Sequence, residues 1–145
     1  MKSDSNSTLP PLLRACWIKL NSTFQKRLSE LKITPDQYTV LRWLSERTKE
    51  QTTQLTLANL MFTDANNISA LLKRMENLGL LSRFSNPNDK RMKIIQISTK
   101  GVEKFNQAKR VASLLEKQAL SGFCEKEKLE FNMLLGRLNE FLNKS

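Results

Sequence analysis

Few side chains in this sequence could carry chemistry. There is no histidine, and the two cysteines are Cys16 and Cys124. The absence of histidine excludes Ser-His-Asp and Cys-His nucleophilic catalysis, and two cysteines cannot supply the four ligands of a structural zinc site. The sequence also lacks a glycine-rich phosphate-binding loop. We therefore expect no catalytic residues, no metal site, no cofactor and no enzymatic activity.

Positive charge is the remaining chemical feature, and it predicts binding to an anion. The 145 residues include 24 Lys and Arg against 14 Asp and Glu, which gives a net charge of +10. Residues 82–110 hold eight basic and two acidic residues, so this short segment carries +6 of that charge. Most charge runs are solvated faces. Nucleic acid is the commonest large anionic partner, so the elements around the segment must decide between the two interpretations.

A polar and basic helix face is predicted just upstream of the charged segment. Apolar residues recur at helical spacing over residues 65–78, and Gly79 ends the pattern. Thr63 or Asp64 can cap the start of this helix. The opposite arc carries amides, an alanine and two cations, namely Asn66, Ala70, Lys73, Arg74 and Asn77. A short helix ending near Met61 comes first, and two short helices joined by a tight turn are typical of a helix-turn-helix.

A basic hairpin is predicted directly after this helix. Residues 80–85 and 92–98 are strand-like and include β-branched and aromatic residues, which favours strands. The segment between them, residues 86–91, reads Asn-Pro-Asn-Asp-Lys-Arg and is a turn by composition. A helix-turn-helix followed by such a hairpin is a winged helix, which here spans about residues 34–98.

Amphipathic helices are predicted on both sides of the winged helix, at residues 12–32 and 99–143, with a break at Gly122. Their apolar stripes are too large to remain in water, so we expect the helices of two chains to interlock in a homodimer. Residues 1–11 are rich in Ser and Asn and end in two prolines, which predicts a disordered tail. Residues 12–145 would then form a single domain, mainly α with a small β-hairpin wing.

The sequence gives no sign of a membrane segment or a secretion signal. No apolar run approaches the roughly 18 residues that a membrane helix needs, and the polar N-terminus leads into no signal-peptide core. We therefore expect a cytoplasmic protein without a membrane partner.

Three motifs in the chain match one family pattern. Residues 33–38 read Ile-Thr-Pro-Asp-Gln-Tyr, where the family has Leu-Thr-Pro-x-Gln-Phe. Residues 71–80 read Leu-Leu-Lys-Arg-Met-Glu-Asn-Leu-Gly-Leu, similar to the family's recognition-helix tail. Residues 89–101 fit its wing signature, Asp-x-Arg-x5-Leu-Thr-x-x-Gly, with Ile-Ser in place of Leu-Thr. With all three in order, the chain resembles the MarR family of winged helix-turn-helix transcriptional regulators over residues 12–142.

The resemblance implies a homodimer that binds a pseudo-palindromic operator in double-stranded DNA. It also implies repression of transcription, with release by a small-molecule effector or an oxidant. In the family the recognition helix enters the major groove and the wing reaches the minor groove, so Arg91 is expected in the minor groove with Asp89 fixing its direction. The sequence departs from the pattern at Phe62, where many members have glycine, and at Ala70, which is often polar or basic.

Ten residues make up the predicted DNA-binding surface. They are Asn66, Asn67, Ser69, Ala70, Lys73, Arg74, Asp89, Lys90, Arg91 and Lys93. The amides and the serine lie early in the recognition helix, where base edges are reached, and asparagine suits adenine. Lysines and arginines contact phosphates, and narrow A/T-rich minor grooves attract arginine. The alternatives are ordinary polar residues at a helix start, an Asp89–Arg91 ion pair within a loop, and solvated lysines.

Four residues could line an effector pocket between the flanking helices and the winged helix, namely Cys16, Trp17, Trp43 and Phe62. We favour core packing for the three aromatic residues. Cys16 lies on the apolar stripe of its helix, where a buried cysteine usually behaves as a small hydrophobe. Redox sensing is the less favoured alternative. The resemblance implies a sensing cysteine in the first helix that is hydrogen-bonded to tyrosines, and the chain has a single tyrosine, Tyr38. At Cys124, Glu125 and Glu127 oppose formation of a thiolate.

Two other functions stay open at this point. One is a winged-helix dimer that acts mainly in protein association, which the near-neutral recognition helix and Ala70 favour and the +6 segment opposes. The other is an architectural protein that binds DNA without sequence preference. Selection of bound fragments from random duplex DNA separates all three.

Overall fold

The computed structural model describes residues 8–144, and its first helix begins at Leu9. Of the predicted tail, residues 1–7 lie outside the described residues. Residues 9–11 form the first turn of the helix, so the prediction of a tail was wrong there. Pro10 and Pro11 fit this turn because the first N–H groups of a helix have no intrahelical acceptor to lose.

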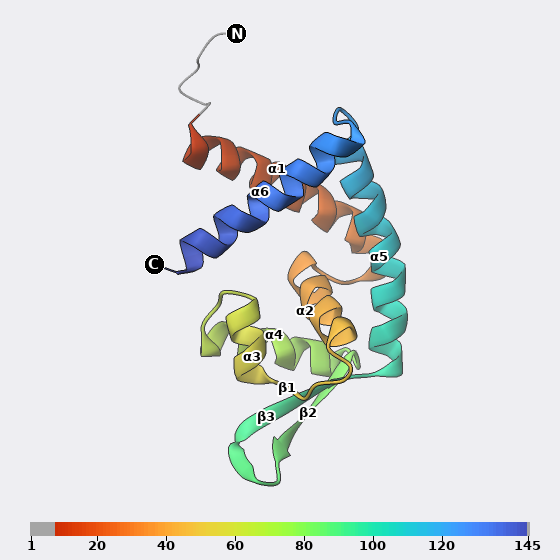
Figure 1. Ribbon diagram of the computed structural model, residues 1–145. Coiled ribbons are helices and arrows are strands. Elements are labelled where there is room, and N and C mark those ends of the chain that lie inside the picture. Colours follow the sequence, from red (N-terminus) through yellow and green to blue (C-terminus); the bar gives the residue numbers. More distant parts are fainter. Residues whose placement is uncertain (1–7, 145) are drawn as a thin grey trace. The chain divides into compact units, whose positions relative to one another are not determined.

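The secondary structure is mainly helical, with one small antiparallel sheet (Figure 1). In chain order the elements are α1 (Leu9–Leu28), η2 (Ser29–Leu31), α2 (Pro35–Glu46), β1 (Thr52–Thr53), α3 (Gln54–Leu60), α4 (Ala65–Asn77), β2 (Leu81–Asn86), β3 (Asp89–Ile97), α5 (Thr99–Ala119) and α6 (Glu125–Asn143). The chain divides into two compact units, one ending at Val111 and the other starting at Ala112. The single domain predicted over residues 12–145 thus contains two such units, and α5 runs from the first into the second.

Side-chain hydrogen bonds cap the starts of α2 and α4. Gln37 N donates to Thr34 Oγ1 at 3.2 Å and Thr34 N donates to Gln37 Oε1 at 3.1 Å, which forms the capping box of α2. Asp64 caps α4, and Gly79 follows that helix with a φ of 77°. Such caps contribute about 1 kcal/mol each. They fix where two helices of the predicted winged helix begin and end.

The sheet has three antiparallel strands in the order β1-β3-β2. Ile94 of β3 pairs with Phe84 of β2 and with Thr53 of β1. The polar residues 48–54 predict a loop, which is wrong at β1, because a strand of two residues shows no alternation of polar and apolar side chains. β3 begins at Asp89, three residues before the predicted strand, so Arg91 lies on the strand and not in the turn. Figure 1 shows the β2–β3 hairpin extending away from α3 and α4.

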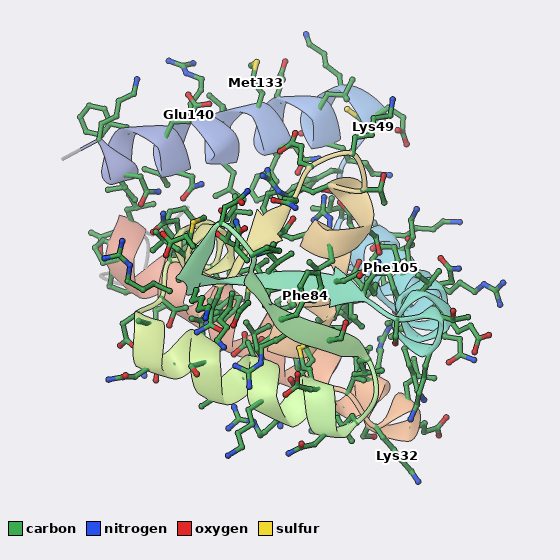
Figure 2. All side chains as sticks on the ribbon, turned by 90° about the horizontal axis from the view of Figure 1, so that it is seen from below. Lys32, Lys49, Phe84, Phe105, Met133 and Glu140 are labelled. Atoms are coloured by element: carbon green, nitrogen blue, oxygen red, sulfur yellow. The ribbon has the colours of Figure 1, made fainter. Side chains whose placement is uncertain are left out.

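The core of the first unit holds α4 in place. Fully buried side chains come from four helices and from the turn before β2, and include Leu28, Leu41, Leu57, Ile68, Leu72, Met75 and Leu80. Phe105 of α5, labelled in Figure 2, stacks on Tyr38 with 5.8 Å between ring centroids, and Phe24 meets Tyr38 edge-on at 5.2 Å. Because the apolar side of α4 is anchored here, its polar side faces solvent.

Apolar faces of α1 and α6 stay exposed in the described chain. Every residue of α1 from Leu9 to Leu20 is exposed, so the predicted apolar stripe does not bury Cys16 or Trp17 within one chain. None of the α6 side chains is buried in the described part of the chain, and Met133, labelled in Figure 2, is 57% exposed. Among residues 8–144, no helix has both the length and the apolar character needed to cross a bilayer.

Candidate nucleic-acid interface

The first turn of α4 is held by its cap residue. Asn67 N donates to Asp64 Oδ1 at 2.7 Å, and Asn67 Nδ2 donates to Asp64 Oδ2 at 3.1 Å. The side-chain amide of Asn67 is therefore engaged with the cap. Asn66 beside it is exposed, so it is the better placed of the two asparagines to reach a base edge.

The two sides of α4 differ as the sequence predicts. Its buried residues are Ile68, Leu71, Leu72 and Met75. The residues predicted to contact DNA are exposed, namely Asn66, Asn67, Ala70, Lys73 and Arg74, except for Ser69, which is half-buried. The exposed face of α4 therefore offers amides, one methyl group and two cations.

The turn between α3 and α4 has an unusual backbone. Phe62 has a φ of 52°, in the left-handed region that favours glycine. Thr63 N donates to Ala58 O at 3.0 Å, as in the Schellman ending of a helix. For a residue with a side chain, this conformation costs about 1–2 kcal/mol. The side chain of Phe62 is 67% exposed, so burial does little to offset the strain.

A cavity of about 400 Å³ lies beside Phe62 and the exposed face of α4. It is lined by Asp36, Met61, Phe62, Thr63, Asn67, Ala70, Leu71 and Arg74. Cys16, Trp17 and Trp43 are not part of this lining, since the first two are exposed on α1 and Trp43 packs against the core. The four residues predicted to form an effector pocket are thus not brought together around this cavity, because they lie on separate elements.

The wing presents Arg91 outward. Asp89 Oδ1 accepts from Arg91 N at 3.0 Å and from Arg91 Nε at 3.3 Å, and the Arg91 side chain is 93% exposed. Asn86 Oδ1 accepts from Asn88 N at 2.9 Å and so tightens the turn before Asp89. The carboxylate therefore pairs with the Nε edge of the Arg91 guanidinium, while most of the side chain stays in solvent. Along the same strand, Lys93 Nζ donates to Ser85 Oγ at 3.2 Å.

A second cavity, of about 360 Å³, lies between the wing and the helix-turn-helix. Its lining comes from β1, α3, the start of α4 and β3, and comprises Thr53, Gln54, Leu55, Ala58, Asn59, Thr63, Ala65, Ile68, Arg91, Met92 and Lys93. Arg91 and Lys93 therefore share one surface with the first turn of α4. This brings wing cations and the start of α4, predicted from separate stretches of sequence, to the same side of the first unit.

One basic residue of the +6 segment is used inside the fold. Arg83 Nη2 donates to Glu76 Oε1 at 3.4 Å, and Arg83 Nη1 donates to Gln54 Oε1 at 3.3 Å. Glu76 Oε2 also accepts from Arg83 N at 3.2 Å. The Arg83 side chain is only 18% exposed, so it ties β2 to α4 and α3 instead of facing an anion. In the sequence this residue contributes only to the charge count, because Gln54 lies 29 positions away in the chain.

Removing the Arg83 hydrogen bonds should lower the free energy of unfolding more than removing a surface ion pair does. Arg83→Met is expected to lower the free energy of unfolding by about 1–2 kcal/mol, because Glu76 and Gln54 lose their partner in a partly buried place. Arg42→Met is the matched control, since its ion pair with Glu46 at 2.9 Å is half-exposed on both sides. That control should change the free energy by at most about 0.5 kcal/mol. Urea denaturation measures both, and equal effects would contradict the role given to Arg83.

The elements that hold this surface match a known family. Residues 33–93, which run from the start of α2 into β3, match the model described as the MarR family. Residues 33–93 therefore form a MarR-family domain. A curated MarR-family relative, the HTH-type transcriptional regulator PecS of Dickeya dadantii, is 25% identical over 124 residues, which are 85% of this chain and 75% of PecS.

Solved MarR-family structures share the fold. A MepR–DNA complex of S. aureus has a TM-score of 0.85 at 22% identity, covering 92% of this chain and 97% of that one. A mutant MarR from E. coli complexed with operator DNA has a TM-score of 0.78 at 26% identity, and the match covers 94% of this chain and 99% of that MarR chain. These matches confirm the predicted winged helix-turn-helix and the family resemblance. Proteins of the MarR family are transcriptional regulators and not enzymes.

The end of the MarR-family wing signature has a structural role here. Gly101 N donates to Ser98 Oγ at 3.0 Å, and Ser98 Oγ donates to Gly79 O at 2.6 Å. Ser98 therefore links the start of α5 to the turn after α4, so the serine found in place of the family's threonine keeps the capping hydrogen bond. Gly101 is buried, and a Cβ there would lie within contact distance of Leu80 O and 2.7 Å from Ile97 Cγ1.

Proposed function

We propose that this MarR-family transcriptional regulator binds double-stranded DNA sequence-specifically as a homodimer, recognises a pseudo-palindromic operator, and represses transcription until a small ligand releases it. The observation that carries the proposal is the wing arginine. Asp89 holds Arg91 by two hydrogen bonds while 93% of its side chain stays exposed, which is the arrangement a minor-groove contact needs.

The exposed face of α4 supplies the contacts to the major groove. Asn66 can donate to and accept from adenine, and Lys73 and Arg74 carry the charge that positions a protein on phosphates. The DNA complexes of MepR and MarR, which share the fold of this chain, support the same use of the surface here. Lys90 and Lys93 flank Arg91 on the wing and would contact the phosphate backbone.

The exposed apolar faces of α1 and α6 support the homodimer. Large apolar residues are exposed on α1, namely Leu9, Leu12, Leu13, Trp17, Ile18 and Leu20, and on α6, namely Leu129, Phe131, Met133, Leu134, Leu135 and Phe141. Contiguous apolar surface of this kind usually marks an interface. A second copy of this chain is the partner we propose, because two-fold symmetry would place two α4 helices on one pseudo-palindromic site.

Repression and release by a ligand come to this chain from the family resemblance. Repression predicts that deleting the protein raises transcription of the gene next to its binding site. Transcript measurement in cells with and without the protein tests this, and lower transcription after deletion would make it an activator.

Arg91→Ala should weaken binding to the selected DNA site by about tenfold and remove its preference for flanking A/T pairs. The matched control is Lys109→Ala, which removes one exposed cation of the same +6 segment from α5. Fluorescence anisotropy at fixed salt measures both, because phosphate contacts make affinity salt-dependent. Equal losses in the two variants would mean that Arg91 contributes only general charge. Binding of neither wild type nor variants to any duplex would favour protein association.

A further inference from the structure

We propose that Phe62, together with Ala70, recognises the 5-methyl group of thymine in the major groove. The inference rests on the proposed function, because it requires the chain to bind duplex DNA through α4. It names the base that the turn between α3 and α4 selects.

Folding alone gives no reason to keep a phenylalanine at this turn. Phe62 has a φ of 52°, which glycine adopts without steric cost, and its side chain is 67% exposed. Strained residues of this kind concentrate at functional sites. The exposed ring is therefore placed to contact a molecule that binds to this surface.

That surface is continuous with the exposed face of α4. Phe62 lines the same 400 Å³ cavity as Ala70 and Arg74, with Asn67 also in the lining. Ala70 is exposed in the middle of α4 and contributes only a methyl group. The cavity therefore joins the apolar groups of Phe62 and Ala70 to polar side chains, on the helix face that offers the major-groove contacts.

Thymine is the base that presents an apolar group in the major groove, and phenylalanine and alanine side chains contact that methyl group. Asp36 and Arg74 bring opposite charges to the lining of the cavity, so the lining has no excess positive charge that would select a phosphate. A base edge carrying a methyl group fits this chemistry better than the DNA backbone does.

The test replaces thymine by deoxyuracil in the duplex site that the wild-type protein selects. This change removes the methyl group and keeps every hydrogen-bonding group. We expect one thymine position in each half-site to respond to this change. Removing the methyl group at one such position should lower wild-type affinity about fourfold. Phe62→Leu, which keeps an apolar side chain, should retain part of this sensitivity. Phe62→Asn, which tolerates a left-handed backbone, should lose most of the discrimination between the thymine and uracil sites, with only the Ala70 contact left.

Each result bears on the inference. Unchanged wild-type affinity after uracil replaces every thymine would overturn it, while continued binding to the selected site would leave the proposed function intact. Equal sensitivity in wild type and Phe62→Asn would also overturn it, because another residue would then read the methyl group. If the wild type bound no duplex, both proposals would fail. The thermal midpoint of Phe62→Asn should be unchanged or higher, and a fall would contradict the premise that Phe62 is strained.

Discussion

Gly101→Ala should strongly destabilise the winged helix. The new Cβ would overlap Leu80 O and lie 2.7 Å from Ile97 Cγ1, and neither the carbonyl nor the strand can move without disturbing its neighbours. Leu80 O also accepts from Ser98 N at 3.1 Å, so moving α5 away would break that hydrogen bond. We expect the free energy of unfolding to fall by about 3 kcal/mol, at the upper end for overpacking.

Gly122→Ala is the control for Gly101→Ala. A Cβ at Gly122 would meet nothing within 4 Å, so the free energy of unfolding should change by less than about 0.5 kcal/mol. Urea denaturation followed by circular dichroism measures both variants. If the two variants had the same free energy of unfolding, this would contradict the close packing of Gly101 against Leu80.

Charging the apolar face of α6 should separate the proposed dimer. Leu134→Asp combined with Phe141→Asp places two carboxylates on residues that are 54% and 75% exposed in the single chain and that line one surface hollow. Buried between two copies, each charge would be strongly unfavourable, so we expect monomers. Affinity for the operator should fall by at least about a hundredfold, because one chain would contact only one half-site.

Light scattering and anisotropy on the same samples test this second prediction. Asn132→Asp adds negative charge at an exposed polar position of α6, and helical spacing puts it on the side opposite Leu134. That control should remain a dimer and bind DNA. A doubly charged variant that stayed dimeric and bound the operator would place the dimer interface elsewhere.

Local signals in the sequence predicted much of this fold. Thr34 and Gln37 form the capping box that their residue types and three-residue spacing predict, Asp64 is one of the two caps proposed for α4, and Gly79 follows that helix with a positive φ. Each depends on residues within four positions in the chain, so short-range rules are enough to find it. The amphipathic pattern likewise predicted the buried residues of α4, but Leu78, the last apolar residue of the pattern, is 41% exposed.

Features that depend on distant residues could not be predicted in the same way. In the sequence Arg83 counts as surface charge, because its partner Gln54 lies 29 positions away, on α3. The two residues of β1 become a strand only because β3 pairs with them. Phe62 could be predicted only in part. The family resemblance marked its position as one where glycine is common, but only the backbone showed that phenylalanine keeps the glycine conformation.

The most direct test of the proposed function is selection of bound fragments from random duplex DNA by the wild-type protein at moderate salt. We predict enrichment of one two-fold symmetric sequence, with half-sites about one helical turn apart and A/T pairs at the flanks where Arg91 would lie. Enrichment of no sequence, despite binding, would show an architectural protein. A site without two-fold symmetry would contradict the homodimer that reads it.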